Sequence, residues 1–326
     1  MGLRHPALRW CAGKLLRLLL VVLAVSALTF LMVDLLPGDA AYDIAGTDAT
    51  PEDVEALRQQ LGLNRPVAVR YAEWLAKAAV GDLGRSYRTR ESVRDAVWKR
   101  LPVTLELTLL SVILALLLAV PVGILCAYRH RSGLDKTLNS LAFATLSLPS
   151  FVMALLMIYL FSVRLRWLPA TGFVPLSVSP AANLQCMLLP AVSIAMAEWV
   201  PLMRVLRSDM IATLREDFIL MARCKGLSAA RILFRHALRP STFTLVTVIG
   251  LHIGHLIGGA LVVEWIFALP GMGRLLVTAI FARDSLLVQG CILCITVGYV
   301  IVHFGVDLLY LLLDPRLRSP NGRNVR

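Results

Sequence analysis

Long apolar stretches alternate along this chain with short polar segments. The apolar runs cover residues 15–36, 103–128, 138–163, 186–206, 241–263 and 286–312, and each carries very little charge. A helix needs about 20 apolar residues to cross the hydrocarbon core of a bilayer. The pattern therefore predicts an all-α integral membrane protein with six transmembrane helices. Pro121 and Pro149 lie inside the second and third runs and predict a kink in each.

The first apolar run also has to be compared with a signal peptide. A basic start precedes it, and Val25-Ser26-Ala27 would serve as a cleavage site. The run nevertheless continues to Leu36, which is longer than the apolar region of a signal peptide. We expect it to be retained as the first transmembrane helix.

The polar segment 37–102 has the pattern of a small helical lobe. Thr50 is placed as an N-cap, with Pro51 at the first helical position, Asp53 three residues after the cap and Gly62 as a stop. A second helix is predicted between residues 64 and 81, and a third, amphipathic one from 91 to 101 leads into the second span. We expect this lobe to lie over the outer mouth of the membrane part.

Charge predicts the orientation. The chain has 33 Lys and Arg against 21 Asp and Glu, a net charge of +12. Basic residues concentrate before the first span, in segments 129–136 and 204–239, and at the C-terminus. The positive-inside rule then places both termini in the cytoplasm and the 37–102 lobe outside. The predicted domains are 1–36, the lobe 37–102, a five-span core 103–313 with a cytoplasmic loop at 207–240, and a tail 314–326. Because the charges bracket apolar runs, no nucleic-acid binding is expected.

The cytoplasmic loop contains the strongly basic stretch "ARCKGLSAARILFRHALRPS", residues 222–241. Gly226 permits a tight turn, Ser228 can cap a short helix that reaches Leu238, and Pro240 is expected to end it before the fifth span. Such a helix either lies on anionic lipid headgroups or docks into a groove of another protein. The pattern alone leaves both interpretations open.

This stretch resembles the cytoplasmic loop signature of ABC importer permeases. Ala222, Gly226 and Leu238 match it. The departures are Leu220 and Met221 in place of Glu and Ala, His236 in place of Ile, and a proline one residue late at Pro240. Further stretches are similar to the peptide and nickel branch of these permeases, among them "LLPGDAA", "LGLNRPVAVRYAEWL", "GDLGRSY", "RLPVTLEL", "SLPSF", "GGALVVEWIFALPGMGR" and "VDLLYLLLDPRLR". They are colinear over roughly 300 residues.

The resemblance implies that the basic loop is the coupling helix of an importer in a bacterial inner membrane. The residues implied to meet an ATPase subunit are Ala222, Lys225, Gly226, Leu227, Ser228, Arg231, Arg235 and His236. The implied partners are a second homologous permease, two ATPase subunits, an extracytoplasmic substrate-binding protein and the lipid bilayer. Gly13-Lys14 lacks the other residues of a P-loop, and no catalytic motif is recognised. We therefore expect no enzyme activity and no cofactor here, with ATP and Mg²⁺ bound by the partner ATPases.

Ionisable residues inside apolar spans are candidates for the substrate path. They are Glu198, His252, His255, His303 and Asp307. His252 and His255 lie three apart on one helical face, and imidazole is a good ligand for nickel. The alternative for this pair is a hydrogen bond in helix packing, helped by the nearby glycines. Glu106 and Glu264 are expected to serve packing or gating, Arg204 to extend toward the membrane surface, and Cys291 and Cys294 to be ordinary buried cysteines.

The substrate prediction rests on the histidines and on the resemblance. "HIG" followed by "LIGG" is similar to nickel permeases of this branch, whereas His255 departs from them. We expect the chain to translocate nickel, as a chelate or metallophore complex. The alternative is the same role for di- and oligopeptides. A membrane metalloenzyme is a remote third possibility, because the spacing supplies pairs of ligands and not three.

Overall fold

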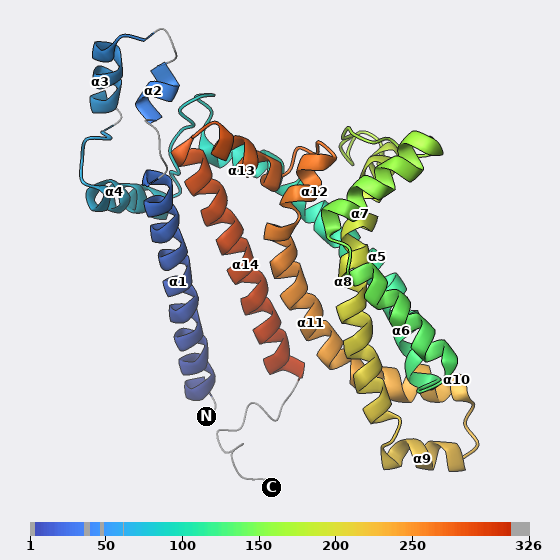
Figure 1. Cartoon of the computed structure of the whole chain (residues 1–326). Coiled ribbons are helices and arrows are strands. Elements are labelled where there is room, and N and C mark those ends of the chain that lie inside the picture. The colour runs from blue at the N-terminus through green and yellow to red at the C-terminus, as the bar shows by residue number, and fades with distance from the viewer. Residues whose placement is uncertain (1–3, 36–39, 46–48, 61, 314–326) are drawn as a thin grey trace. The chain divides into compact units, whose positions relative to one another are not determined.

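The computed structural model describes residues 4–35, 40–45, 49–60 and 62–313. Within these ranges, the side chains of residues 4–12, 40, 43, 44, 255, 258, 259 and 309–313 are not described, and the predicted tail 314–326 lies outside the described residues. The described chain is helical apart from loops and one isolated bridge between Arg85 and Ser92. It divides into two units, residues 1–104 with 270–301 (unit 1) and residues 105–269 with 302–326 (unit 2) (Figure 1). Unit 1 thus joins the predicted lobe to the first span and to a distant segment.

Unit 1 contains four helices from the N-terminal third of the chain, the first turns of α5, and two later pieces. The helices are α1 (Arg4–Asp34), α2 (Ala40–Ala45), α3 (Pro51–Gln60), α4 (Val67–Ala79), α5 (Val93–Tyr128, as far as Thr104), α13 (Met272–Phe281) and α14 (Ser285–Leu313, as far as Ile301). Unit 2 holds the remainder of α5 and of α14. Between them lie α6 (Gly133–Leu146), α7 (Ser150–Met157), the π-helix η1 (Ile158–Arg164), α8 (Pro180–Thr213), α9 (Asp217–Cys224), α10 (Ala229–Arg231), the π-helix η2 (Ile232–Ala237), α11 (Leu238–Gly259) and α12 (Leu261–Ile266).

The first lobe helix begins as predicted. The Thr50 backbone N–H donates to the Asp53 carboxylate at 3.1 Å, and the Asp53 N–H donates to the Thr50 hydroxyl at 3.3 Å. This reciprocal capping box satisfies two donors that the helix itself leaves free. The Thr50 hydrogen bonds lower the pKa of Asp53. Gly62 has φ +66° just beyond α3, which confirms the predicted stop.

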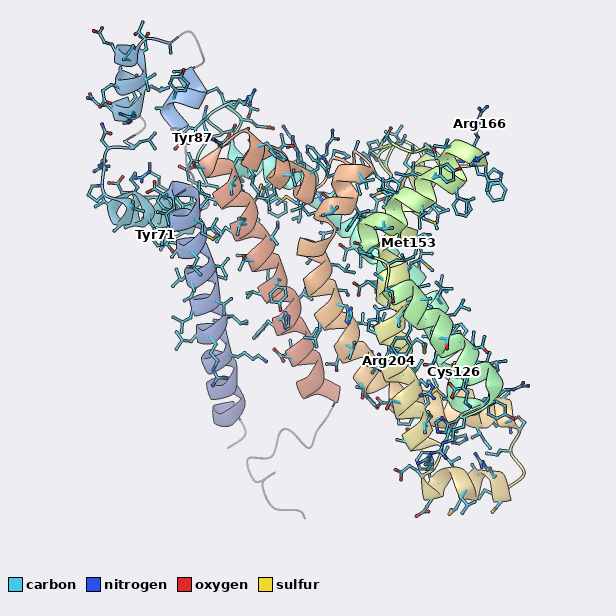
Figure 2. The ribbon with its side chains drawn as sticks, viewed as in Figure 1. Tyr71, Tyr87, Cys126, Met153, Arg166 and Arg204 are labelled. Atoms are coloured by element: carbon cyan, nitrogen blue, oxygen red, sulfur yellow. The ribbon has the colours of Figure 1, made fainter. Side chains whose placement is uncertain are left out.

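The second lobe helix differs from its prediction at the N-terminus. α4 begins at Val67 with Pro66 in the cap position, whereas Asn64 donates its side-chain amide to Glu55 at 3.0 Å. Gly81, with φ +87°, follows the helix as predicted. The Tyr71 and Ser26 hydroxyls lie 2.8 Å apart, and Phe30 meets the Tyr71 ring edge-on at 5.6 Å. These contacts, with an ion pair between Arg70 and Asp34, hold α4 against the end of α1 (Figure 2).

A short hairpin connects α4 to α5 and is anchored on the start of α14. The Ser86 hydroxyl donates to the buried Asp284 carboxylate, which also caps α14 by accepting from the Leu287 N–H at 3.2 Å. The third predicted lobe helix is the first part of α5 and continues without interruption into the second span. Burial raises the pKa of Tyr87 in this hairpin, and the Asp284 charge adds to the shift.

In unit 2, the core forms where α5, α6, α8, α9, η2 and α11 meet. Its fully buried members include Leu202, Met203, Leu206, Met210 and Ile219. Gly123 of α5 allows close approach, because a Cβ at this position would lie 3.2 Å from the Met203 carbonyl oxygen. This core extends to the end of the unit that carries α9 and α10 (Figure 1), so the basic loop is packed against the spans.

Among the described residues, four helices are long and apolar enough to cross a membrane, and one bent pair adds a fifth candidate. The four are Gly13–Asp34, Val93–Tyr128, Pro180–Thr213 and Ser285–Leu308, and the pair is Gly133–Leu146 with Ser150–Arg164. α11 covers residues 241–259 of the predicted fifth run, and α12 begins at Leu261. All six predicted runs are therefore helical, while the six-span count and the orientation remain predictions.

Proline acts differently in the second, third and fourth runs. The predicted kink at Pro149 is a full break, since α6 ends at Leu146, Pro149 caps α7, and the two directions differ by 94°. The prediction of a single kinked helix was wrong here, because proline disfavours helical geometry at the residue before it. α5 runs unbroken through Pro121, and α8 runs unbroken through Pro190 and Pro201.

Candidate functional site

The basic loop contains two helical segments joined by a turn at Gly226. α9 ends at Cys224, and the Gly226 and Leu227 N–H groups return to the carbonyls of Arg223 and Ala222 at 2.9 and 3.3 Å. Gly226 has φ +71°, in the left-handed region that glycine adopts without strain. A Cβ there would meet nothing within 4 Å. The predicted tight turn is confirmed, and its requirement for glycine is conformational.

Burial divides the predicted coupling residues into two groups. Ala222 is buried and belongs to the unit 2 core together with Ile219, Ile232 and Leu233. Leu227 and His236 are partly buried. The exposed residues are Lys225, Gly226, Ser228, Arg231 and Arg235. The exposed group is the most accessible to another protein, while Ala222 helps to hold the loop on the spans.

The helix after Gly226 differs from the prediction. Ser228 lies at the N-cap of α10 but its side chain makes no capping bond. The prediction that Pro240 ends the helix was wrong, because α10 passes through η2 directly into α11, and Pro240 lies in the first turn of α11. A π-helical segment bonds five residues ahead, which leaves room for a proline without an N–H. α9 was not predicted, although Ile219 and Ala222, three apart and both buried, carried the signal.

A buried ion pair that we did not predict joins α6 to the last part of α8. Arg207 of α8 donates to both oxygens of Asp135 at 2.8 and 2.7 Å. The Asp135 side chain is 5% exposed and also accepts from the Arg131 N–H at 3.0 Å and the Asn139 amide at 2.8 Å. Every oxygen of this carboxylate is thereby satisfied. The pair fixes the start of α6 to α8, at a position six residues before α8 ends at Thr213.

A second polar pair lies inside the spans. His252 Nδ1 of α11 contacts the Glu198 carboxylate of α8, and the two side chains are 26% and 12% exposed. Both residues were predicted for the substrate path, and the structure brings them together. The side chain of His255 lies outside the described residues. His303 and Asp307 are one turn apart on α14 and partly buried.

The structure also locates the candidate metal ligands and the remaining ionisable residues of the spans. Among the described residues, no group of three or more His, Cys, Asp or Glu side chains is arranged to hold a metal. Arg204 lies with its guanidinium 5.0 Å from the ring centre of Phe143 (Figure 2), a cation–π contact in addition to the expected reach toward the surface. Glu264 is fully buried in α12, and Cys291 and Cys294 are free thiols on α14.

Comparison with known proteins gives consistent similarities. The family described as "Binding-protein-dependent transport system inner membrane component" matches residues 119–319, and its N-terminal companion family matches residues 7–108. The "Putative peptide transport system permease protein" of Brucella abortus (strain 2308) is 43% identical over 298 residues, covering 91% of this chain and 95% of that protein. The glutathione transport system permease protein GsiC of Escherichia coli O6:H1 is 35% identical over 311 residues, covering 95% and 99%.

A solved structure shares the fold. An inward-facing crystal form of the MetNI methionine ABC transporter contains a chain that superimposes with a TM-score of 0.53 at 15% sequence identity. The match covers 67% of this chain and 96% of the other. At this identity the likeness concerns the arrangement of the helices.

Proposed function

Since the chain belongs to the family of binding-protein-dependent transport system inner membrane components, we propose that it carries peptides across the bacterial inner membrane. The chain is a permease subunit of an ABC transporter, and the ATP is hydrolysed by partner ATPase subunits. The observation that carries the peptide proposal is the 43% identity to a peptide transport permease over 91% of this chain.

The names of the relatives favour peptide over nickel. A second relative, 35% identical over 311 residues, is named for glutathione, which is itself a small peptide. None of these names supports the nickel prediction. Peptide transport, the alternative that the sequence left open, is therefore better supported than nickel transport.

In the proposed mechanism, partner ATPase subunits move the helices of unit 2 and thereby drive transport. The exposed residues of the turn, Lys225, Gly226 and Ser228, dock on an ATPase subunit, and the buried residues of α9 and η2 pass its movement to α8 and α11. A second permease of the same family completes the path, and a substrate-binding protein delivers peptide from the outside to the lobe. Affinity resides in that binding protein, so the path needs only weak and displaceable contacts.

Within the path, the Glu198–His252 pair is the proposed contact for the peptide. A carboxylate in an apolar span favours a cationic group, and a peptide brings its terminal ammonium. The pair is partly exposed and not sealed. The Glu198 carboxylate can therefore exchange its contact with His252 for one with the passing ammonium.

The substrate class is tested by uptake in a strain that lacks only this chain. We expect uptake of labelled di- and tripeptides to fall to background and to return when the gene is restored, while accumulation of radioactive nickel is unchanged. The same strain carrying the empty vector is the control. Normal peptide uptake together with lost nickel accumulation would overturn the proposal and favour the nickel prediction.

The path residues are tested by Glu198→Gln. The variant keeps the shape and a hydrogen bond to His252 but loses the charge, so we expect peptide uptake to fall about tenfold, because a hydrogen bond to a charged group contributes about 1.5–3 kcal/mol. Asp95→Asn, which neutralises an exposed carboxylate at the start of α5, should leave uptake unchanged. An N-acetylated peptide should enter equally slowly in wild type and variant. If Glu198→Gln transports free peptides at the normal rate, the pair does not contact them.

A further inference from the structure

An apolar groove lies on unit 2 between the last turns of α5 and the π-helix η2. Its volume is about 430 Å³. Five of its lining residues come from α5 and two from η2: Val120, Pro121, Ile124, Leu125, Tyr128, Leu233 and Phe234. Ile124 and Leu233 are buried and form the floor. The lining is hydrocarbon and aromatic apart from the Tyr128 hydroxyl.

The walls of this groove are open, and no other element of the described part of the chain covers them. Leu125, Tyr128 and Phe234 are 39%, 52% and 62% exposed. From Val120 to Tyr128 the groove follows eight helical steps, about 12 Å along α5. One leaflet of a bilayer has an apolar depth of about 15 Å, half of the hydrocarbon core. The groove therefore has nearly the length of an acyl chain within one leaflet.

Basic residues border the groove at one end. Arg129 follows Tyr128 along the chain, with Arg131 two residues further, and Arg235 follows Phe234, with Arg231 three residues before it. All four are exposed, and among the described residues no ion pair joins them to a carboxylate. The nearby Asp135 is already bound by Arg207 and by the Arg131 backbone. Asp209, Glu216 and Asp217 are the acidic residues of segment 207–240, against seven Lys and Arg, so the segment is net positive.

We infer that this groove binds one anionic phospholipid, with an acyl chain along α5 and η2 and the phosphate on the bordering arginines. The occupant is specified by the combination of an apolar channel and a positive border at the membrane surface, where anionic headgroups are attracted to clustered arginines. A zwitterionic lipid would fill the channel but would not neutralise the border.

The position of the groove gives the lipid a structural role. η2 is continuous with α10, which follows the Gly226 turn, and with α11. An acyl chain that contacts both α5 and η2 links the basic loop to a second transmembrane helix. Lipid occupancy should therefore stabilise the loop in its packed position.

The inference is tested on the complete purified transporter in nanodiscs. The nanodiscs contain either dioleoylphosphatidylcholine alone or the same lipid with about one-fifth dioleoylphosphatidylglycerol. The second lipid gives the bilayer the negative surface charge that anionic lipids give a cell membrane. Native mass spectrometry after detergent release counts the lipids retained. We expect wild type to retain phosphatidylglycerol about tenfold over phosphatidylcholine, because the bordering arginines attract the anionic headgroup. Inorganic phosphate added at millimolar concentration should not displace it.

Two variants separate the parts of the site. The triple variant Arg129→Gln, Arg131→Gln, Arg235→Gln should lose the preference for phosphatidylglycerol, and Leu125→Trp, which fills the groove, should reduce retention of both lipids. The matched controls are Arg88→Gln in the outer hairpin and Leu117→Trp, 65% exposed on α5 outside the groove.

An unchanged lipid preference in the triple variant would overturn the inference, and so would equal effects of Leu125→Trp and Leu117→Trp. The occupant is tested separately: a photo-crosslinking residue at position 234, in place of Phe234, should label lipid in the assembled transporter. Labelling of an ATPase or of the second permease there would show that protein covers the groove.

Discussion

Gly226→Val is expected to abolish transport while the chain reaches the membrane in normal amount. Gly226 has φ +71° and reverses the chain between α9 and α10. A left-handed conformation costs an ordinary residue about 1–2 kcal/mol, and more with a β-branched side chain. Because a Cβ here meets nothing within 4 Å, the effect is on the turn and not on packing. A cost of this size lowers the population of the turn about tenfold or more.

The measurement is substrate-stimulated ATP hydrolysis by the reconstituted complex, with membrane abundance determined in parallel. Gly226→Asn is the matched variant, because asparagine tolerates the left-handed conformation, and it should retain most of the stimulation. Gly133→Ala, at an open position without positive φ, should behave as wild type. Normal transport by Gly226→Val would show that the turn does not couple the ATPase to the spans.

The second large effect is expected from Arg207→Ala. Its guanidinium holds both oxygens of Asp135 at 2.7 and 2.8 Å, and the Asp135 side chain is 5% exposed. Removal of one partner leaves a buried charge without compensation, which costs about 3–5 kcal/mol. We expect a clear fall in the midpoint of heat-induced unfolding in detergent and earlier proteolysis of the basic loop.

The double variant Asp135→Asn, Arg207→Gln tests whether the two side chains stabilise the protein through their contact with each other. Both charges are removed and the polar groups can still bond to each other, so this variant should be more stable than Arg207→Ala alone. Arg215→Ala, an exposed residue at the end of α8, controls for the loss of positive charge. Equal stability of Arg207→Ala and Arg215→Ala would mean that the pair does not hold the loop.

Local features of this protein were predictable from nearby residues. The Thr50–Asp53 capping box is formed within four positions, and the glycines at 62, 81 and 226 adopt the positive φ that their turns require. The Pro240 prediction failed because the effect of a proline depends on the helix before it. Pro240 follows the π-helical segment η2 in the first turn of α11, and the helix continues through it although a local rule treats this proline as a stop.

The candidate site was predicted only in part. Glu198 and His252 were each identified as ionisable residues in apolar runs, but their contact across 54 positions was not. Asp135 and Arg207 were not predicted at all, because both lie at the ends of runs where charged residues are common. Their separation is 72 positions, and no pattern within a single helix indicates such a pairing.

By itself, the sequence determined that this chain is a bundle of membrane helices, where its caps and tight turns lie, and to which family it is similar. These properties follow from hydrophobic periodicity and backbone preferences that act over a few residues. Only the tertiary structure decided which faces of α5, α8, η2 and α11 meet, and hence which charges pair and where the apolar groove lies. Contacts between helices depend on their relative rotation and register, which sum many weak packing terms over the whole unit.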